Sequence, residues 1–288
     1  MGERGRMPDF VIIGALKSAT TSLYRWLDEQ DEIFVPHSKE SRFFADLWSR
    51  GPDWYRGLFA DAADHQLLGE ASVSYTNPMF AARAAERMAN MIPNAQLIYV
   101  VRHPVERIRS QYRHEVQRRR EPRSLLEALQ EPGNPYIGHS LYHACLRPYA
   151  DRFPRDQILV VRFEDLVRPP ALGWSAVLRS LSLTERPLPG TSFNVSDEKA
   201  QWSRVMSWAK RNGFISLRTI SKLPQPIRRV GRTFAHGSQS YETRLEASRV
   251  PIPGEVLTPV WDDVARLEGW LGASLWPREG AAQAKASP

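Results

Sequence analysis

The chain has little of three things: cysteine, lysine and long apolar runs. Its 288 residues include one cysteine, so no disulfide can form within the chain, and this fits a reducing compartment. No apolar run approaches the roughly 18 residues that a membrane-spanning helix needs. The apolar residues 10–16 follow Arg4 and Arg6, but the run is short and Lys17 closes it, which argues against a signal peptide. We therefore expect a cytoplasmic protein without a transmembrane segment.

Lysine is scarce although the chain is basic. The net charge is +7, yet only six of the 39 lysine and arginine residues are lysines, and before Lys199 the two lysines are Lys17 and Lys39. A lysine ammonium is a compact point charge, whereas arginine presents a planar fork. We therefore expect a chemical reason for lysine at positions 17 and 39. The positive charge is scattered, and densest over residues 102–123, which indicates a solvated surface or a field that steers an anionic ligand rather than nucleic-acid binding.

Strand patterns alternate with helix patterns along the chain. The predicted strands are 9–16, 33–36, 96–101 and 157–163, and the predicted helices are 23–30, 82–91, 105–119, 142–151, one ending at 178–183, and 257–271. Such alternation predicts an α/β fold in which helices flank a central parallel sheet. We expect one domain over residues 1–280. Within or after it, we predict a loop at 164–170, a mobile acceptor or lid region at 191–250, and a disordered tail at 281–288.

Residues 14–22, Gly-Ala-Leu-Lys-Ser-Ala-Thr-Thr-Ser, lie between the first strand and an amphipathic helix. Small residues allow successive N–H groups to face an anion, and the N-terminus of the helix adds the positive end of its dipole. The loop is not a Walker A motif, because Leu16 stands where that motif has glycine before its lysine. The pattern therefore favours a site for one phosphate or phosphosulfate group over a helix start that is merely rich in capping residues. A small-metabolite kinase and a non-enzymatic nucleotide-binding protein are the alternatives.

Several segments, in the same order as in a known family, carry a resemblance. The loop at 14–22 with the leucine that follows it resembles the 5′-phosphosulfate loop of sulfotransferases that use 3′-phosphoadenosine 5′-phosphosulfate (PAPS). Lys-Glu-Ser-Arg-Phe-Phe at 39–44 resembles the Lys-Glu loop of that family, and residues 101–112 resemble its 3′-phosphate element. Residues 153–166 continue the pattern. The resemblance is to bacterial members and to the heparan-sulfate N- and O-sulfotransferase type, and it implies their P-loop-like fold.

The same resemblance implies roles for individual residues, with PAPS as co-substrate and no metal. Residues implied to bind PAPS are Lys17, Ser18, Ala19, Thr20, Thr21, Ser22, Arg102, Ser110 and Tyr142. Lys17 would neutralise the charge that develops on the leaving oxygen, and Glu40 would be the general base. Lys39, Glu70 and His103 are the candidates for contact with the acceptor, and Glu70 and His103 are also alternatives to Glu40 as the base.

One departure from the family pattern concerns the acceptor. Ala71 follows Glu70 where heparan-type enzymes usually have a lysine, so a cation that would meet a sulfated sugar is missing. We therefore expect the acceptor to be a hydroxyl of a small molecule, a lipid or a glycosylated metabolite, and not a glycosaminoglycan or a nucleic acid. His139 and His143 have helical spacing but no third ligand, so no metal site is expected. A homo-oligomer is left open.

Overall fold

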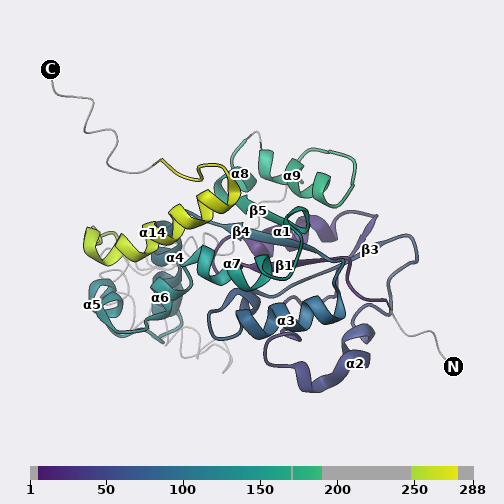
Figure 1. Cartoon of the computed structure of the whole chain (residues 1–288), viewed down its shortest axis with the longest axis horizontal. Coiled ribbons are helices and arrows are strands. Elements are labelled where there is room, and N and C mark those ends of the chain that lie inside the picture. The colour runs from purple at the N-terminus through teal and green to yellow at the C-terminus, as the bar shows by residue number, and fades with distance from the viewer. Residues whose placement is uncertain (1–5, 170, 190–247, 278–288) are drawn as a thin grey trace, which may run out of the picture.

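A five-stranded sheet forms the centre of the molecule (Figure 1). The computed structural model describes residues 6–169, 171–189 and 248–277. The strands are β1 (Phe10–Gly14), β2 (Ile33–Phe34), β3 (Leu67–Ala71), β4 (Gln96–Val101) and β5 (Ile158–Arg162). They lie in the order β2-β3-β1-β4-β5, and each neighbouring pair is parallel. The predicted central parallel sheet is confirmed.

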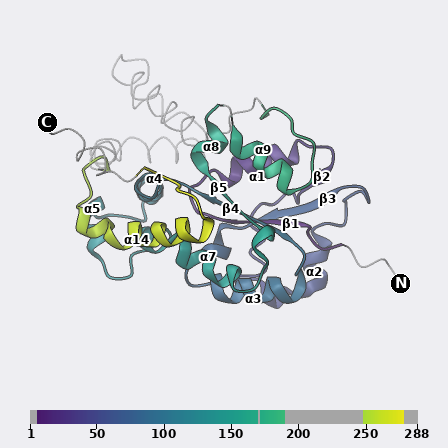
Figure 2. The ribbon, with the colours of Figure 1, turned by 45° about the horizontal axis from the view of Figure 1, so that its top comes forward.

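Helices cover both faces of this sheet (Figure 2). One face carries α1 (Thr20–Asp28), α8 (Phe163–Val167) and α9 (Leu172–Ser180), and the other carries α2 (Gly51–Gly57), α3 (Ala81–Met91), α7 (Tyr142–Ala150) and part of α14 (Gly254–Leu271). Because side chains of a strand alternate between faces, Phe10 and Ile12 pack in one core while Val11 and Ile13 pack in the other. This two-sided burial explains the continuous apolar run at the start of the chain.

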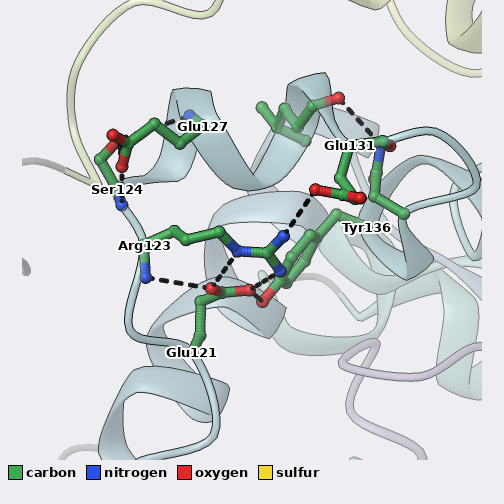
Figure 3. Close-up of polar contacts among 8 residues, drawn as sticks. Glu121, Arg123, Ser124, Glu127, Glu131 and Tyr136 are labelled. Carbon is green, nitrogen blue, oxygen red and sulfur yellow. Dashed lines mark hydrogen bonds and ion pairs between the residues drawn. The ribbon is translucent and has the colours of Figure 1, made fainter.

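A third group of helices follows β4 in the chain and packs around an apolar cluster of its own. It contains α4 (Pro104–Gln117), α5 (Leu125–Gln130) and α6 (Pro135–Gly138), which share an apolar cluster with the start of α14. A polar cluster fastens it: Glu121, 4% exposed, accepts hydrogen bonds from Arg123 at 2.8 Å and from the Tyr136 hydroxyl at 2.9 Å (Figure 3). These bonds hold the segment after α4 against α6.

The structure differs from the sequence-based prediction in a few places. The predicted loop 164–170 is wrong in its first half, because residues 163–167 form α8. Strand β3 was not predicted, since Gly69 and Glu70 interrupt its apolar pattern. Helix α5 was also missed, although Ser124 and Glu127 form a capping box that the sequence displays. Of the predicted acceptor or lid region at 191–250, all but residues 248–250 lie outside the described residues. The predicted tail at 281–288 lies wholly outside them.

Gly69 offers a test of how closely β1 and β3 pack. A Cβ atom at this position would lie 1.9 Å from the ring of Phe10, which is fully buried. We expect Gly69→Ala to lower the free energy of unfolding by about 1–3 kcal/mol, as overpacked cores do. Gly57→Ala is the matched control, because nothing lies within 4 Å of its added methyl group. Urea denaturation measures both, and equal stability of the two variants would contradict the packing described.

Candidate active site

The site lies where the loops after β1 and β4 meet. Because all strands are parallel, these loops both leave the sheet at the carboxyl ends of the strands. After β1 the chain continues to β2 on one side, whereas after β4 it continues to β5 on the other side. Adjacent strands whose connections diverge in this way mark the place where open α/β sheets bind ligands. Lys17 follows β1 and Arg102 follows β4.

The loop between β1 and α1 has an unusual backbone. Lys17 and Ala19 have φ angles of 68° and 60°, in the left-handed region that non-glycine residues rarely adopt. Ala19 is the N-cap residue of α1 and provides no side-chain cap, and the first turn of the helix has no acidic residue. The positive end of the helix dipole is therefore left for an anion to meet. Backbone held in such conformations costs about 1–3 kcal/mol per residue and occurs mostly at functional sites.

The hydroxyl groups of this loop differ in burial. Ser18 is fully buried, and within the described residues its Oγ has no hydrogen-bond partner. The Ser18 N–H donates to the carbonyl of Ala15 at 3.3 Å, so this residue offers its hydroxyl rather than its amide. Thr20 is buried and Thr21 is exposed. A buried donor without a partner costs about 1–3 kcal/mol, which an anionic oxygen bound in the loop would recover.

Arg102 joins the loop from the end of β4. Its Nη1 donates to the Lys17 carbonyl at 3.3 Å, and its guanidinium lies over the ring of Phe163, 4.4 Å from the centroid. The Tyr142 hydroxyl donates to the Arg102 carbonyl at 2.6 Å and accepts from its N–H at 3.4 Å. Tyr142 is fully buried, so it acts on the backbone of Arg102. The Arg102 Nε is buried and has no hydrogen-bond partner in the described parts of the chain.

These cations repel one another. Burial lowers the pKa of Lys17 below its ordinary value, and the charges of Arg102, Arg118 and Arg113 lower it further. Burial is likewise the main cause that lowers the pKa of Arg102. Within the residues that the structure describes, neither Lys17 nor Arg102 forms an ion pair with a carboxylate. The charges of Glu106 and Glu164 act in the opposite direction on Arg102, and that of Glu115 on Lys17, without forming an ion pair in the described part of the chain. Partly buried cations without such a pair are suited to an anionic ligand.

Helix α4 presents further groups to this place. The charge of Glu106 raises the pKa of Arg102 and that of Arg113 lowers it, and both residues lie on α4. Ser110 is four residues after Glu106 and three before Arg113, which puts it on that same face. It is half-buried. Ser110 thus shares a face of α4 with two residues whose charges act on Arg102.

Glu40 lies on the loop after β2, at the end of β3. Its N–H donates to the Ala71 carbonyl at 2.8 Å, and its Oε2 accepts from the Val73 N–H at 2.9 Å. Its Oε1 pairs with the Lys39 ammonium, and the two side chains are 33% and 15% exposed. The carboxylate is therefore held in one place but still reaches solvent. Lys39 and Glu40 thus form an ion pair between neighbouring residues.

Two other sequence candidates have different surroundings. Glu70 is 2% exposed, and hydroxyl groups of the protein occupy both oxygens of its carboxylate. The ring of His103 packs edge-on against Trp261 and Trp276, with centroids 5.4 and 6.0 Å away. The backbone N–H of His103 donates to the Glu164 carboxylate at 3.0 Å. Glu70 is thus part of the interior, and His103 packs beside α14.

Sequence reasoning missed two arginines of the site. Arg113 and Arg118 act on Lys17 through their charge, and both belong to residues 102–123, where the sequence is richest in arginine.

His139 lies before α7 begins, so it does not share a helix face with His143. No group of three metal-ligating side chains occurs among the described residues, and in that same part no helix is both long and apolar enough to cross a membrane.

Known proteins resemble this chain in both sequence and structure. Residues 74–187 match the model of the Sulfotransferase family. The heparan sulfate glucosamine 3-O-sulfotransferase 3A1 of Mus musculus is 30% identical over 175 residues, which is 58% of this chain and 43% of that protein. The bifunctional heparan sulfate N-deacetylase/N-sulfotransferase 3 of Homo sapiens is 27% identical over 227 residues, 71% of this chain and 26% of that protein. The chain thus spans between about a quarter and a half of these relatives.

Two solved structures have the same fold over nearly the whole chain. A sulfotransferase from Alicyclobacillus acidocaldarius is 26% identical with a TM-score of 0.64, and the match covers 94% of this chain and 98% of that one. A sulfotransferase domain of the Synechococcus PCC 7002 olefin synthase is 15% identical with a TM-score of 0.53, covering 95% and 98%, and shows the fold alone. The chain is therefore similar to sulfotransferases, both to a bacterial one in sequence and fold and to the heparan sulfate N- and O-sulfotransferases in sequence.

Proposed function

We propose that this protein transfers a sulfuryl group from PAPS to a hydroxyl of a small molecule, a lipid or a glycosylated metabolite. One observation carries the proposal: Lys17 and Arg102, from loops on adjacent strands, lie together partly buried without a carboxylate partner in the described residues. PAPS carries anionic groups at two positions, the 5′-phosphosulfate and the 3′-phosphate. Two cationic elements side by side suit such a ligand. The relationship to sulfotransferases supports this choice of donor.

The two elements would divide the donor between them. Lys17, the buried hydroxyl of Ser18 and the N-terminus of α1 would hold the 5′-phosphosulfate. Arg102 and Ser110 would hold the 3′-phosphate, and Tyr142 would keep the backbone of Arg102 in place. The unpartnered donors of Ser18 and Arg102 fit anionic oxygens of this kind.

The transfer itself is an in-line displacement. Glu40 takes the proton of the acceptor hydroxyl while that oxygen forms a bond to sulfur. The bond between sulfur and the bridging oxygen breaks, and its electron pair stays on the 5′-phosphate of the departing 3′-phosphoadenosine 5′-phosphate (PAP). Lys17 neutralises the charge that appears there. Lys39, which pairs with Glu40, orients the carboxylate or the acceptor.

The surroundings of Ala71 support an acceptor other than a glycosaminoglycan. Ala71 is 1% exposed and packs in the core against α1, so the end of β3 offers no cation at this position. A polyanionic sugar chain would lack that contact.

We place the reaction in the cytoplasm, because the single cysteine fits a reducing compartment.

Incubation with PAPS and a panel of hydroxylated and amine-bearing metabolites tests the function. We expect a mass gain of one SO₃ on a hydroxyl compound, and release of PAP. Glu40→Gln should lower turnover about 10²–10³-fold, because general bases contribute about 10²–10⁴-fold. The affinity for PAP should stay unchanged. Sulfation of amines alone would contradict O-transfer, and full activity of Glu40→Gln would contradict the base.

Arg102→Ala tests the place of the 3′-phosphate. We expect the affinity for PAP to fall about 100-fold, because a charge-assisted pair is lost, while the weaker binding of adenosine 5′-monophosphate changes little. Arg152→Ala is the control. This exposed arginine lies before β5, at the amino ends of the strands and so away from the loops that carry Lys17 and Arg102. Isothermal titration calorimetry measures all three proteins. Binding of ATP with Mg²⁺ but not of PAP would favour a kinase instead.

The lowered pKa of Lys17 predicts a pH dependence of binding. An anionic ligand prefers the charged ammonium, which is present below the pKa of Lys17 and is lost as the pH rises through it. The affinity for PAP should therefore fall on the alkaline side, at a pH below 10.5, where a free lysine would still be charged. Lys17→Arg should bind PAP without this decline, because arginine keeps its charge. A decline of equal size in both proteins would show that another group titrates.

A further inference from the structure

Glu70 is a buried carboxylate that the proposed chemistry does not use. It lies on β3 and is 2% exposed. Its Oε1 accepts hydrogen bonds from the hydroxyls of Tyr55 at 2.8 Å and Tyr75 at 2.7 Å, and its Oε2 accepts from Ser41 at 2.5 Å. Burying a carboxylate is costly unless such donors surround it. This side chain therefore organises three other residues, which come from different segments of the chain.

One of these residues is the direct neighbour of Glu40. Ser41 binds Glu70 and also lies 2.9 Å from the Tyr75 hydroxyl. On β3, the residue after Glu70 is Ala71, whose carbonyl accepts from the Glu40 N–H. The loop with Glu40 and the end of β3 are thus joined twice, once through a side chain and once through the backbone.

The next residues extend this connection on both sides. Ser72 accepts a hydrogen bond from the Arg42 N–H at 2.9 Å and donates to Glu70 at 3.4 Å. The Val73 N–H, which follows, donates to the Glu40 carboxylate. The donor that fixes the proposed base therefore comes from a turn that Glu70 itself helps to hold.

The loop needs such support because its backbone is strained. Glu40 and Arg42 have φ angles of 72° and 55°, on either side of Ser41. Each left-handed non-glycine residue costs about 1–3 kcal/mol and persists only where neighbouring contacts enforce it. The hydrogen bonds of Ser41 to Glu70 and of Arg42 to Ser72 are the contacts that enforce it here.

We infer that Glu70 is a positioning residue for Glu40, and that it acts by accepting hydrogen bonds from Ser41, Tyr55 and Tyr75 rather than by touching the acceptor. This inference rests on the proposed function, in which Glu40 is the base. Burial is the main cause that raises the pKa of Glu70, which agrees with a role that depends on hydrogen bonds more than on charge. A glutamine would keep the two tyrosine bonds, because its oxygen accepts from both. Its amide would keep a bond to Ser41 in the opposite direction, by donating to the hydroxyl that donates to Glu70 in the natural protein.

The test compares Glu70→Leu with Glu70→Gln. With saturating PAPS and the acceptor found in the panel, Glu70→Leu should lower turnover about 10²-fold. Glu70→Gln should lose no more than about fivefold, and both should bind PAP within twofold of the natural protein. If Glu70→Gln loses as much as Glu70→Leu, the carboxylate itself is needed and the inference is wrong.

A second buried carboxylate with a tyrosine partner provides the matched control. Glu121, which binds Tyr136, lies far from Glu40 in the chain and belongs to the cluster after α4 (Figure 3). Glu121→Leu should lower the thermal midpoint but leave the turnover per folded molecule unchanged. If Glu70→Leu behaves in the same way, its role is only structural and the inference is overturned. Tyr55→Phe, which removes one donor, should lower turnover by a few fold and replaces Glu70→Leu if that variant does not fold.

Hydrogen exchange separates this inference from the proposed function. The amides of Glu40 and Val73 form the bonds described above, so both should exchange more slowly than a free amide. Glu70→Leu should remove this protection while leaving that of β4 intact. If the natural protein neither binds PAP nor transfers a sulfuryl group, the proposed function is refuted. If the amides of Glu40 and Val73 are protected equally in Glu70→Leu and in the natural protein, the positioning role is refuted.

Discussion

The parallel pairing of β1 with β4 is the constraint on which the site depends. Gly14 lies opposite Tyr99, and the Ala15 N–H continues the pairing by donating to the Val100 carbonyl at 2.7 Å. This register decides that the loop with Lys17 and the side chain of Arg102 leave the sheet at the same height. The pairing includes a register shift between Ile12 and Gly14, so the end of β1 departs from a regular ladder just before the loop begins. The helices contribute by covering the faces on which this pairing rests.

The same strand divides the site into two halves. β1 is hydrogen-bonded to β4 on one side and to β3 on the other. Cations follow β1 and β4, whereas the loop with Glu40 is bound to the end of β3. Neighbouring strands lie about 4.8 Å apart, so the two halves of the site are separated by at least the spacing between two strands. In the proposed in-line displacement the base and the leaving group lie on opposite sides of the reacting atom, and this division would suit such a separation.

Much of this arrangement could be predicted from the sequence, because it depends on local patterns. The strand from Gln96 to Val101 and the helix that ends at Met91 follow from apolar periodicity, and the loop around Lys17 follows from its small residues and its place between a strand and a helix. Each of these signals lies within about ten residues.

Features that depend on distant contacts could not be predicted. Nothing near Glu70 in the sequence reveals that Tyr55 and Ser41 bind it, and β3 is a strand because it fits between β2 and β1. The influence of Arg118 on Lys17 likewise requires the fold, since a hundred residues separate them in the chain. The left-handed conformation of Glu40 is a result of these long-range bonds, because glutamate has no local preference for it.

Lys17 and Arg102, which form no ion pair with a carboxylate in the described residues, have a consequence for the folded state as a whole. Their mutual repulsion is present only when the chain is folded, since the unfolded chain lets Lys17 and Arg102 separate in water. An anion that enters the site relieves a strain that belongs to the native state alone. A ligand at 100 times its dissociation constant adds about 2.7 kcal/mol to the stability of the form that binds it. Under the proposed function, the nucleotide would stabilise the folded protein as well as react, and resistance to heat or proteolysis would rise with its concentration.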